Sequence, residues 1–206
     1  SQTAAKGGFK ELEMDELLRF EKEATGLYIS GHPLTKYEEL TKRLVNCDSS
    51  MLVPTIEENM DEDGESKVEF LVEDGKPVYL AGLVSAIKTY MTKGDNPALM
   101  AFVTIEDVYG TYEIVVFSKL YEKKAAIIKK DMPLLIKGFI SIRDGSSVTI
   151  KVSDVYSLDD GSTVAKLKPL EKIEPQNTGA KNENKKQPQK AKETEKKYET
   201  SSEAHA

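Results

Sequence analysis

The chain has 206 residues and a formal net charge of −6, with the excess of acidic side chains in residues 1–77 and a slightly basic stretch in residues 78–157. Its single cysteine, Cys47, excludes an internal disulfide and suits a reducing, cytoplasmic location. One cysteine and two histidines cannot supply the ligands of a protein-only zinc site, and no apolar run is long enough to predict a membrane span.

The first part of the chain, residues 1–45, is predicted to be a small helical segment. Apolar side chains recur at helical spacing over Met14–Ala24, which indicates an amphipathic helix, and Gly26 is suited to end it. Thr35–Val45 predicts a second short helix. The chain begins with Ser1 instead of methionine, and we expect it to be a piece of a longer protein.

Residues 46–76 are rich in acidic side chains and turn formers and poor in large apolar ones. This composition predicts an acidic linker or a loosely packed connection, with an isolated strand conceivable within Lys67–Val72. At the other end of the chain, residues 159–206 lose apolar content and are predicted to form a disordered, charged tail.

From Pro77 the pattern changes to β-strands. Val78–Thr89 is the first predicted strand, and Gly82 within it predicts a bend or bulge. The second and third strands flank Gly110, and we predict that this glycine supplies the positive φ that a tight hairpin turn needs. The further predicted elements are the strands Ala98–Asp107 and Thr111–Phe117, a helix within Lys119–Lys130, and the strands Pro133–Arg143 and Val148–Ser157.

Five strands with a helix between the third and the fourth have the element order of an OB-fold, a Greek-key barrel. We therefore predict a mainly β protein, in which residues 77–158 form a five-stranded OB-fold domain after the helical segment and the linker. OB-folds bind oligonucleotides on strands two and three and on the loops between strands one and two and strands four and five.

The predicted hairpin offers aromatic side chains for an unpaired base. Alternation along the second strand places Ala101, Val103 and Ile105 toward a core and puts Phe102 on the opposite face. Phe102 is a candidate for stacking on a base of single-stranded DNA, with packing as the alternative role. Further candidates for the same platform are Tyr109, in the turn, and Tyr112, which equally fits inward packing.

Side chains of both charges lie near the same predicted face, so some would attract phosphate and others would repel it. Lys88, Lys93 and Arg143 flank the two loops and are candidates for phosphate contacts, although each also fits an ordinary solvated surface charge. Glu106 and Glu113 repel phosphate, so we expect weak binding, and a protein partner on this face remains an alternative. Asp107 beside the turn is predicted to accept hydrogen bonds from nearby backbone N–H groups.

Two stretches, residues 21–34 and residues 100–117, carry motifs that resemble those of the bacterial replicative DNA polymerase III alpha subunit. Residues 21–34, EKEATGLYISGHPL, are similar to the family's E-K-E-x-x-G-x-Y-x-S-G-H-P-L signature. Met100–Phe117 is similar to its M-A-F-V-T-x-E-D-x-x-G-x-x-E-x-V-V-F segment, and the order and spacing also agree over roughly residues 10–157. The resemblance implies a C-terminal portion of a DNA-directed DNA polymerase, a nucleotidyltransferase. It would comprise the end of a helix-hairpin-helix region and an OB-fold that contacts single-stranded template DNA during replication.

The resemblance carries no catalytic residue, metal ligand or cofactor into this chain. Magnesium would be held by the palm domain of the parent polymerase, to which nothing here corresponds, so we expect no catalysis by this chain alone. The implied partners are single-stranded DNA and the rest of the polymerase III holoenzyme, including the sliding clamp and the clamp loader, with no membrane. The alternative is an OB-fold protein-docking module within the replisome, and a steep salt dependence of single-strand binding would separate the two.

Overall fold

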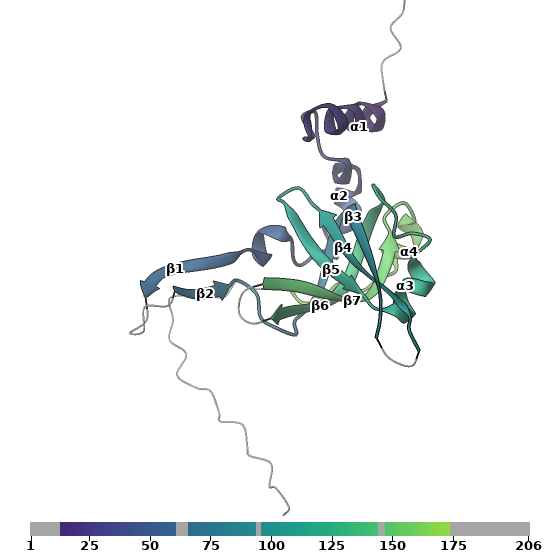
Figure 1. The fold of residues 1–206 in the computed structure, drawn as a ribbon. Helices are drawn as coiled ribbons and strands as arrows, with labels where there is room; N and C mark the ends of the chain where they lie inside the picture. The colour runs from purple at the N-terminus through teal and green to yellow at the C-terminus, as the bar shows by residue number, and fades with distance from the viewer. Residues whose placement is uncertain (1–12, 61–65, 94–95, 144–146, 174–206) are drawn as a thin grey trace, which may run out of the picture. The chain divides into compact units, whose positions relative to one another are not determined.

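The computed structural model describes residues 13–60, 66–93, 96–143 and 147–173, and its centre is a closed five-stranded barrel (Figure 1). The strand order around the barrel is β3-β4-β5-β7-β6. A helix lies between the third and the fourth barrel strand, so the predicted OB-fold is confirmed. The elements are β3 (Pro77–Met91), β4 (Leu99–Glu106), β5 (Thr111–Val116), α3 (Ser118–Lys124), β6 (Pro133–Arg143) and β7 (Ser147–Ser157).

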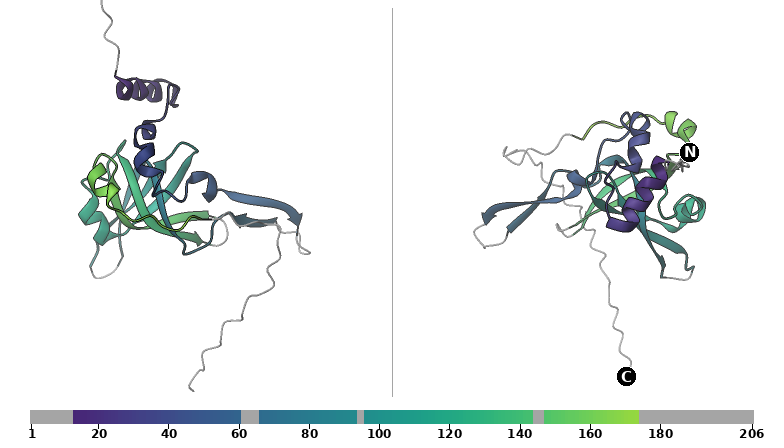
Figure 2. Two further views of the ribbon diagram at one scale, coloured as in Figure 1. Left: turned by 180° about the vertical axis from the view of Figure 1, so that it is seen from behind. Right: turned by 90° about the horizontal axis from the view of Figure 1, so that it is seen from above.

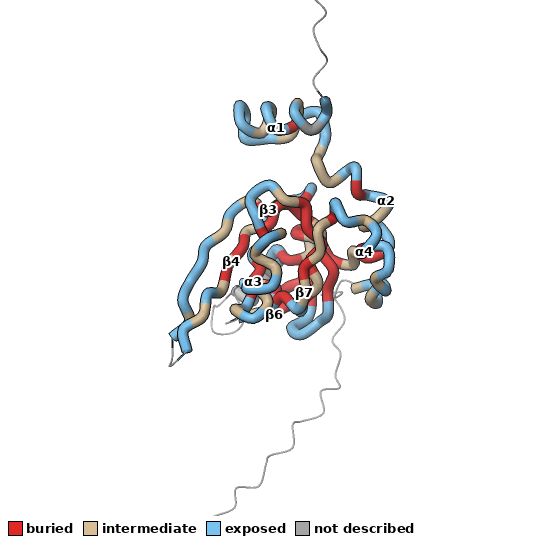
Figure 3. The backbone as a smooth tube through the Cα atoms, turned by 90° about the vertical axis from the view of Figure 1, so that its right-hand side faces the viewer, coloured by how far each residue is buried: buried red, intermediate tan, exposed pale blue. Residues whose placement is uncertain are grey.

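Alternation along the strands fills the barrel with aliphatic side chains. On β4, Ala101, Val103 and Ile105 are fully buried, whereas Phe102 between them is only half-buried, as predicted. The barrel closes through a short parallel pairing of β5 with β7, and the buried strands stand out in Figure 3. Branched aliphatic residues suit this interior because their stiff side chains pack well on a pleated surface.

Gly82 allows β3 to approach β4 closely. A Cβ at this position would lie 2.1 Å from Cγ2 of Ile105 and 2.9 Å from the carbonyl oxygen of Glu106. The register shift that curves β3 lies further along, between Val84 and Ala86. The glycine therefore provides space, and the irregularity follows it.

Helix α3 is shorter than predicted because the chain turns inward after Lys124. Ile128, which the predicted helix included, is 2% exposed and belongs to the barrel core. The connection then reaches β6 through Asp131, which has a left-handed φ of 64° and whose N–H donates to the carbonyl of Val84 at 2.8 Å.

The N-terminal segment packs on the outside of the barrel. Helix α1 (Met14–Thr25) ends at Gly26, whose φ of 76° is left-handed, as the sequence predicted. Two short helical pieces, η1 (Pro33–Tyr37) and α2 (Glu38–Thr41), follow. Together with α4 (Gly161–Ala165) they cover a second buried cluster on the outer surface of β3 and β6, made of Tyr37, Leu44, Tyr79, Leu135, Leu158 and Val164.

Residues 46–76 contain more ordered structure than a linker composition indicates. After η2 (Ser49–Leu52), strands β1 (Pro54–Met60) and β2 (Ser66–Phe70) form an antiparallel hairpin that extends away from the barrel (Figures 1 and 2). The last residue of β2 and residues on either side of the hairpin enter the barrel core, namely Phe70 and Cys47, Leu52 and Val72. The strand expected within 67–72 is therefore paired, because β1 supplies its partner.

The structure describes only the first part of the predicted C-terminal tail, residues 159–206. Residues 159–173 are described and include α4, in which Val164 is fully buried. Residues 174–206 of the predicted tail lie outside the described residues. Among the helices that the structure describes, none is long and apolar enough to cross a membrane.

Candidate nucleic-acid interface

A row of outward-facing side chains crosses four neighbouring strands of the barrel. The register places Lys88 of β3 opposite Phe102 of β4, and Phe102 opposite Val115 of β5. Val115 in turn pairs with Lys151 of β7. Adjacent strands lie about 4.8 Å apart, so the row is roughly 14 Å long. The lysine at each end is exposed and Phe102 is half-buried, whereas Val115 between Phe102 and Lys151 is only 2% exposed.

A second ring extends the aromatic part of this row. Tyr90 of β3 lies edge-to-face against Phe102, with 5.5 Å between the ring centroids and 87° between the ring planes. Tyr90 is 52% exposed, and Phe102 is half-buried. Together the two rings form a surface on which an unpaired base could stack.

The other predicted cations and Tyr109 lie on either side of the row, toward the two ends of the barrel. Lys93 is exposed in the loop between β3 and β4, and Arg143 is exposed at the end of β6. Because β5 runs antiparallel to β4 and parallel to β7, the β6–β7 turn lies at the same end of the barrel as the β4–β5 turn. Arg143 and Tyr109, which is 68% exposed, therefore lie toward one end of the interface, and Lys93 lies toward the other.

Tyr112 does not lie on the predicted face. It points inward with the barrel core, is 6% exposed, and its buried hydroxyl has no hydrogen-bond partner. Burial raises the pKa of this hydroxyl well above its usual value, with a further contribution from the negative charge of Asp107. Tyr112 lies two residues before the core residue Ile114 on β5, so both side chains are on the inner face of the strand. The Tyr112 ring is therefore not available for stacking.

The negative charge at Glu106 has a partner that the sequence did not indicate. Lys22 of α1 makes an ion pair with Glu106, with 2.5 Å between Nζ and Oε1. The side chains are only 34% and 21% exposed, so the pair is partly shielded from water. Glu113 is exposed on the outer face of β5. Of the two carboxylates expected to repel phosphate, one is thus already paired.

Asp107 organises the turn between β4 and β5, as predicted. Its Oδ1 accepts hydrogen bonds from the backbone N–H groups of Tyr109 and Gly110, at 2.9 and 3.0 Å. The same carboxylate accepts from the backbone N–H and the hydroxyl of Ser49 in η2, at 2.8 and 2.6 Å. The turn that carries Tyr109 is therefore anchored to the N-terminal part of the chain.

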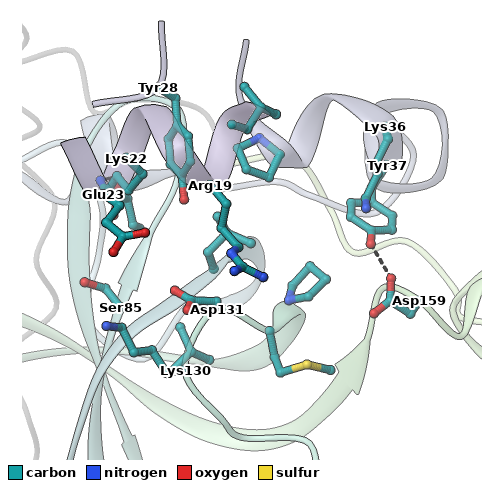
Figure 4. Close-up of a pocket in the computed structure, with 17 residues that line it drawn as sticks. Arg19, Lys22, Glu23, Tyr28, Lys36, Tyr37, Ser85, Lys130, Asp131 and Asp159 are labelled. Carbon is teal, nitrogen blue, oxygen red and sulfur yellow. Dashed lines mark hydrogen bonds and ion pairs between the residues drawn. The ribbon is translucent and has the colours of Figure 1, made fainter. Parts of the chain in front are cut away.

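A separate pocket of about 720 Å³ lies between the helical segment and the barrel (Figure 4). Arg19 and Tyr28 point into it from the helical side, and Asp131 lies on the opposite wall (Figure 4). The Tyr37 hydroxyl donates a hydrogen bond to Asp159, and burial together with this bond raises the pKa of Tyr37 to about 12. Each side of the pocket carries both signs of charge, with Arg19, Lys22, Glu23 and Lys36 from the helical segment and Glu106, Lys130, Asp131 and Asp159 from the barrel and its loops.

The sequence did not single out Lys151 and Tyr90, which the structure places beside Val115 and Phe102 of the candidate interface. Period-two alternation on β7 places Lys151 on the outer face, between the buried Ile150 and Val152. That signal was present in the sequence, but its position beside Val115 depends on the parallel pairing of two strands that are not consecutive. Within the described residues, no group of three or more His, Cys, Asp or Glu side chains is arranged to hold a metal ion.

Comparisons with known proteins match both the barrel and the longer chain. Residues 78–158 match the family described as OB-fold nucleic acid binding domain. The DNA polymerase III subunit alpha of Thermus aquaticus is 34% identical over 151 residues, which cover 71% of this chain and 11% of that protein. The subunit of Borreliella burgdorferi is 34% identical over 154 residues, covering 74% and 12%.

The chain thus spans about a tenth of the length of these relatives, at 11% and 12% of each. Among solved structures, a mitochondrial single-stranded DNA binding protein from S. cerevisiae aligns with 42% of this chain and 96% of its own. It does so at 12% identity and a TM-score of 0.33, which is too loose to bear on function.

Proposed function

This chain is a relative of one segment of the bacterial DNA polymerase III alpha subunit, and we propose that its OB-fold binds single-stranded template DNA during replication in the cytoplasm. The observation that carries the proposal is the row of Lys88, Phe102, Val115 and Lys151 across the barrel. In this proposal a base stacks on Phe102, and the phosphates on either side of it approach the two lysines.

The chemistry of the row favours a single strand of any sequence. Stacking on Phe102 and Tyr90 requires an unpaired base, and every base has a face that can stack. Lysine recognises phosphate as a point charge, which carries no information about the base. We therefore assign this surface to holding the template. In this proposal nucleotide transfer and its magnesium ions belong to the palm domain of the parent polymerase, and the partners remain single-stranded DNA and the rest of the polymerase III holoenzyme, including the sliding clamp and the clamp loader.

A salt titration of binding tests the proposal. The full chain is titrated into fluorescently labelled oligo-dT, and anisotropy gives the affinity at several salt concentrations. Each phosphate neutralised on a single strand contributes about −0.7 to the slope of log K against log salt. Contacts by the four cations Lys88, Lys93, Arg143 and Lys151 predict a slope of about −3, and Lys151→Gln should reduce its magnitude by about 0.7.

A second experiment tests the stacking. Phe102→Leu keeps an apolar side chain but removes the aromatic face, and it should weaken oligo-dT binding by at least roughly fivefold, because one stacked base contributes about 1–3 kcal/mol. Phe20→Leu on α1 is the matched control, since Phe20 is 54% exposed and lies outside the row. Thermal unfolding of both variants checks that the barrel is intact.

Two outcomes would contradict the proposal. Equal affinities of Phe102→Leu and the unchanged chain at low salt would remove Phe102 from the interface. Absence of binding at low salt, or binding that salt does not weaken, would favour the alternative in which this barrel docks onto a protein.

A further inference from the structure

A second exposed ring lies beside the lysine at the β7 end of the row. Strand β6 pairs with β7, and the register places Phe139 of β6 opposite Lys151. Phe139 is 46% exposed, whereas Gly138 and Ile140 on either side of it are buried. Its partner on the other neighbouring strand is Pro77 at the start of β3, which is exposed. The ring therefore points outward from the barrel, between an exposed lysine and an exposed proline.

Phe139 extends the row to the fifth strand of the barrel. The row then consists of Lys88, Phe102, Val115, Lys151 and Phe139, with one residue from each strand. Phe139 lies three strands beyond Phe102, which is about 14 Å measured along the sheet at about 4.8 Å per strand. Because the barrel is closed, this path curves around its surface. A single strand that reaches both rings must therefore wrap part of the barrel.

The surface around Phe139 is basic. Lys137 and Arg143 lie on the same side of β6 as Phe139, two positions before it and four positions after it. Residues 139–143 and 147–153 include no acidic side chain, and Asp144 in the turn between them lies outside the described residues. A ring with cations on several sides suits a nucleotide, whose base can stack while its phosphates approach positive charge.

Two of the carboxylates that border this surface already have partners. Asp74 Oδ1 accepts a hydrogen bond from the N–H of Ile142 at 2.9 Å, and Asp154 Oδ1 lies 2.8 Å from Nζ of Lys124. Glu113, which is exposed on β5, lies on the side of β7 away from β6. The charge of the outer face of β6 and β7 therefore favours a polyanion.

We propose that the single strand held on Phe102 continues past Lys151 and places a second base on Phe139. Lys151 then contacts the phosphates between the two stacked bases. OB-folds bind oligonucleotides on their second and third strands, here β4 and β5, so this assigns binding to a further face made by β6 and β7. The inference rests on the proposed function, because it takes stacking on Phe102 as given and extends the path of the same strand.

Two lengths of labelled oligo-dT test this inference with the full 206-residue chain. One OB-fold covers about 4–16 nucleotides, so oligomers of four and of sixteen nucleotides represent the two ends of this range. Phe139→Leu keeps an apolar side chain but removes the aromatic face. It should weaken binding of the long oligomer by roughly fivefold or more, as expected for one lost stacking contact, and leave binding of the short oligomer unchanged.

Two control variants separate the ring from a general change of the surface. Phe139→Tyr keeps an aromatic face and should bind both oligomers as tightly as the unchanged chain does. Phe20→Leu replaces a ring on α1 that is 54% exposed and lies outside the row, and it should also leave both affinities unchanged. Thermal unfolding of the variants checks that the barrel is intact.

A fluorescence signal reports directly on the position of the base. The chain contains no tryptophan, so Phe139→Trp introduces a single indole at this place. A base that stacks on the indole should quench its emission. We expect quenching by the long oligomer and not by the short one, because only the long oligomer reaches from Phe102 to β6.

The outcomes distinguish this inference from the proposed function. Unchanged binding of the long oligomer by Phe139→Leu, or no quenching of Phe139→Trp by the long oligomer, would overturn this inference alone. Equal quenching by both oligomers would also overturn it, because position 139 would then hold bases independently of Phe102. Failure to bind either oligomer at low salt would overturn the proposed function and this inference together.

Discussion

Lys22 Nζ lies 2.5 Å from Glu106 Oε1, and this ion pair joins α1 to the end of β4 across 84 positions of sequence. Lys22 also lies over the ring of Tyr28, 4.8 Å from its centroid. The two stretches that resemble one family are therefore in direct contact in the fold. Their contact neutralises the carboxylate of Glu106, which lies four residues after Phe102 on the same face of β4.

Breaking this pair should affect both stability and DNA binding. Lys22→Met leaves the carboxylate of Glu106 unpaired beside the interface, so oligo-dT affinity should fall because phosphate is repelled. Glu106→Gln removes the charge and should keep or raise the affinity. A double-mutant cycle in urea denaturation should give a coupling of about 1 kcal/mol, as for a partly exposed pair. A coupling of zero would show that α1 is held by other contacts.

Asp107 should contribute far more to stability than Ser49, its partner in η2. Asp107→Ala removes the acceptor of four hydrogen bonds in a buried site and should lower the free energy of unfolding by about 3 kcal/mol. Ser49→Ala removes only the 2.6 Å hydroxyl bond and should cost about 1 kcal/mol. Denaturant unfolding measures both, and similar losses for the two variants would contradict a central role of the carboxylate.

Substitution of Tyr109 should weaken DNA binding, whereas removal of the Tyr112 hydroxyl should leave it unchanged. Tyr112→Phe removes a buried hydroxyl without a partner, so it should leave oligo-dT binding unchanged and leave stability unchanged or slightly higher. Tyr109→Ala removes a ring that is 68% exposed and should weaken binding without lowering the unfolding temperature. Anisotropy and thermal melting of the two variants provide the check, and weaker binding by Tyr112→Phe would return that ring to the interface.

The barrel should lose stability in acid as the stabilising carboxylate of Asp154 becomes protonated. Burial pushes the pKa of its carboxyl upward, but hydrogen bonds from Lys124, Tyr156 and the N–H of Val155 outweigh this and hold the pKa below its ordinary value. A carboxyl whose pKa is lowered by folding stabilises the protein at pH values above its unfolded-state pKa of about 3.9. This contribution is lost as the pH falls through the folded-state pKa.

Asp154→Asn removes the titrating group that carries this contribution. The difference in free energy of unfolding between the unchanged chain and Asp154→Asn should therefore be largest near neutral pH and shrink below about pH 4. Lys124 Nζ lies 2.8 Å from Asp154 Oδ1 and also donates to the carbonyl of Val155, so Lys124→Met should show the same narrowing. A difference that is constant with pH would contradict the lowered pKa.

The sequence by itself determined the five barrel strands and the inner face of the β4–β5 hairpin. Ala101, Val103 and Ile105 are buried as their period-two spacing predicted, and β6 has the predicted bounds Pro133–Arg143. These features are local, because side chains alternate across a strand whatever the strand pairs with. The end of α1 at Gly26 is local in the same way, since it depends on the left-handed backbone of one residue. Gly110 differs from the prediction, because it lacks the predicted positive φ and the Asp107 carboxylate holds the turn by accepting from the N–H groups of Tyr109 and Gly110.

The tertiary structure decided which of these faces meet. Lys151 joins the row through the parallel pairing of β5 with β7, and Lys22 reaches Glu106 only after α1 folds back onto the barrel. Alternation gives the side of a strand on which a residue lies, but it says nothing about which strand lies beside it. That choice depends on burying the whole core at once, so it is made by contacts between residues far apart in the sequence.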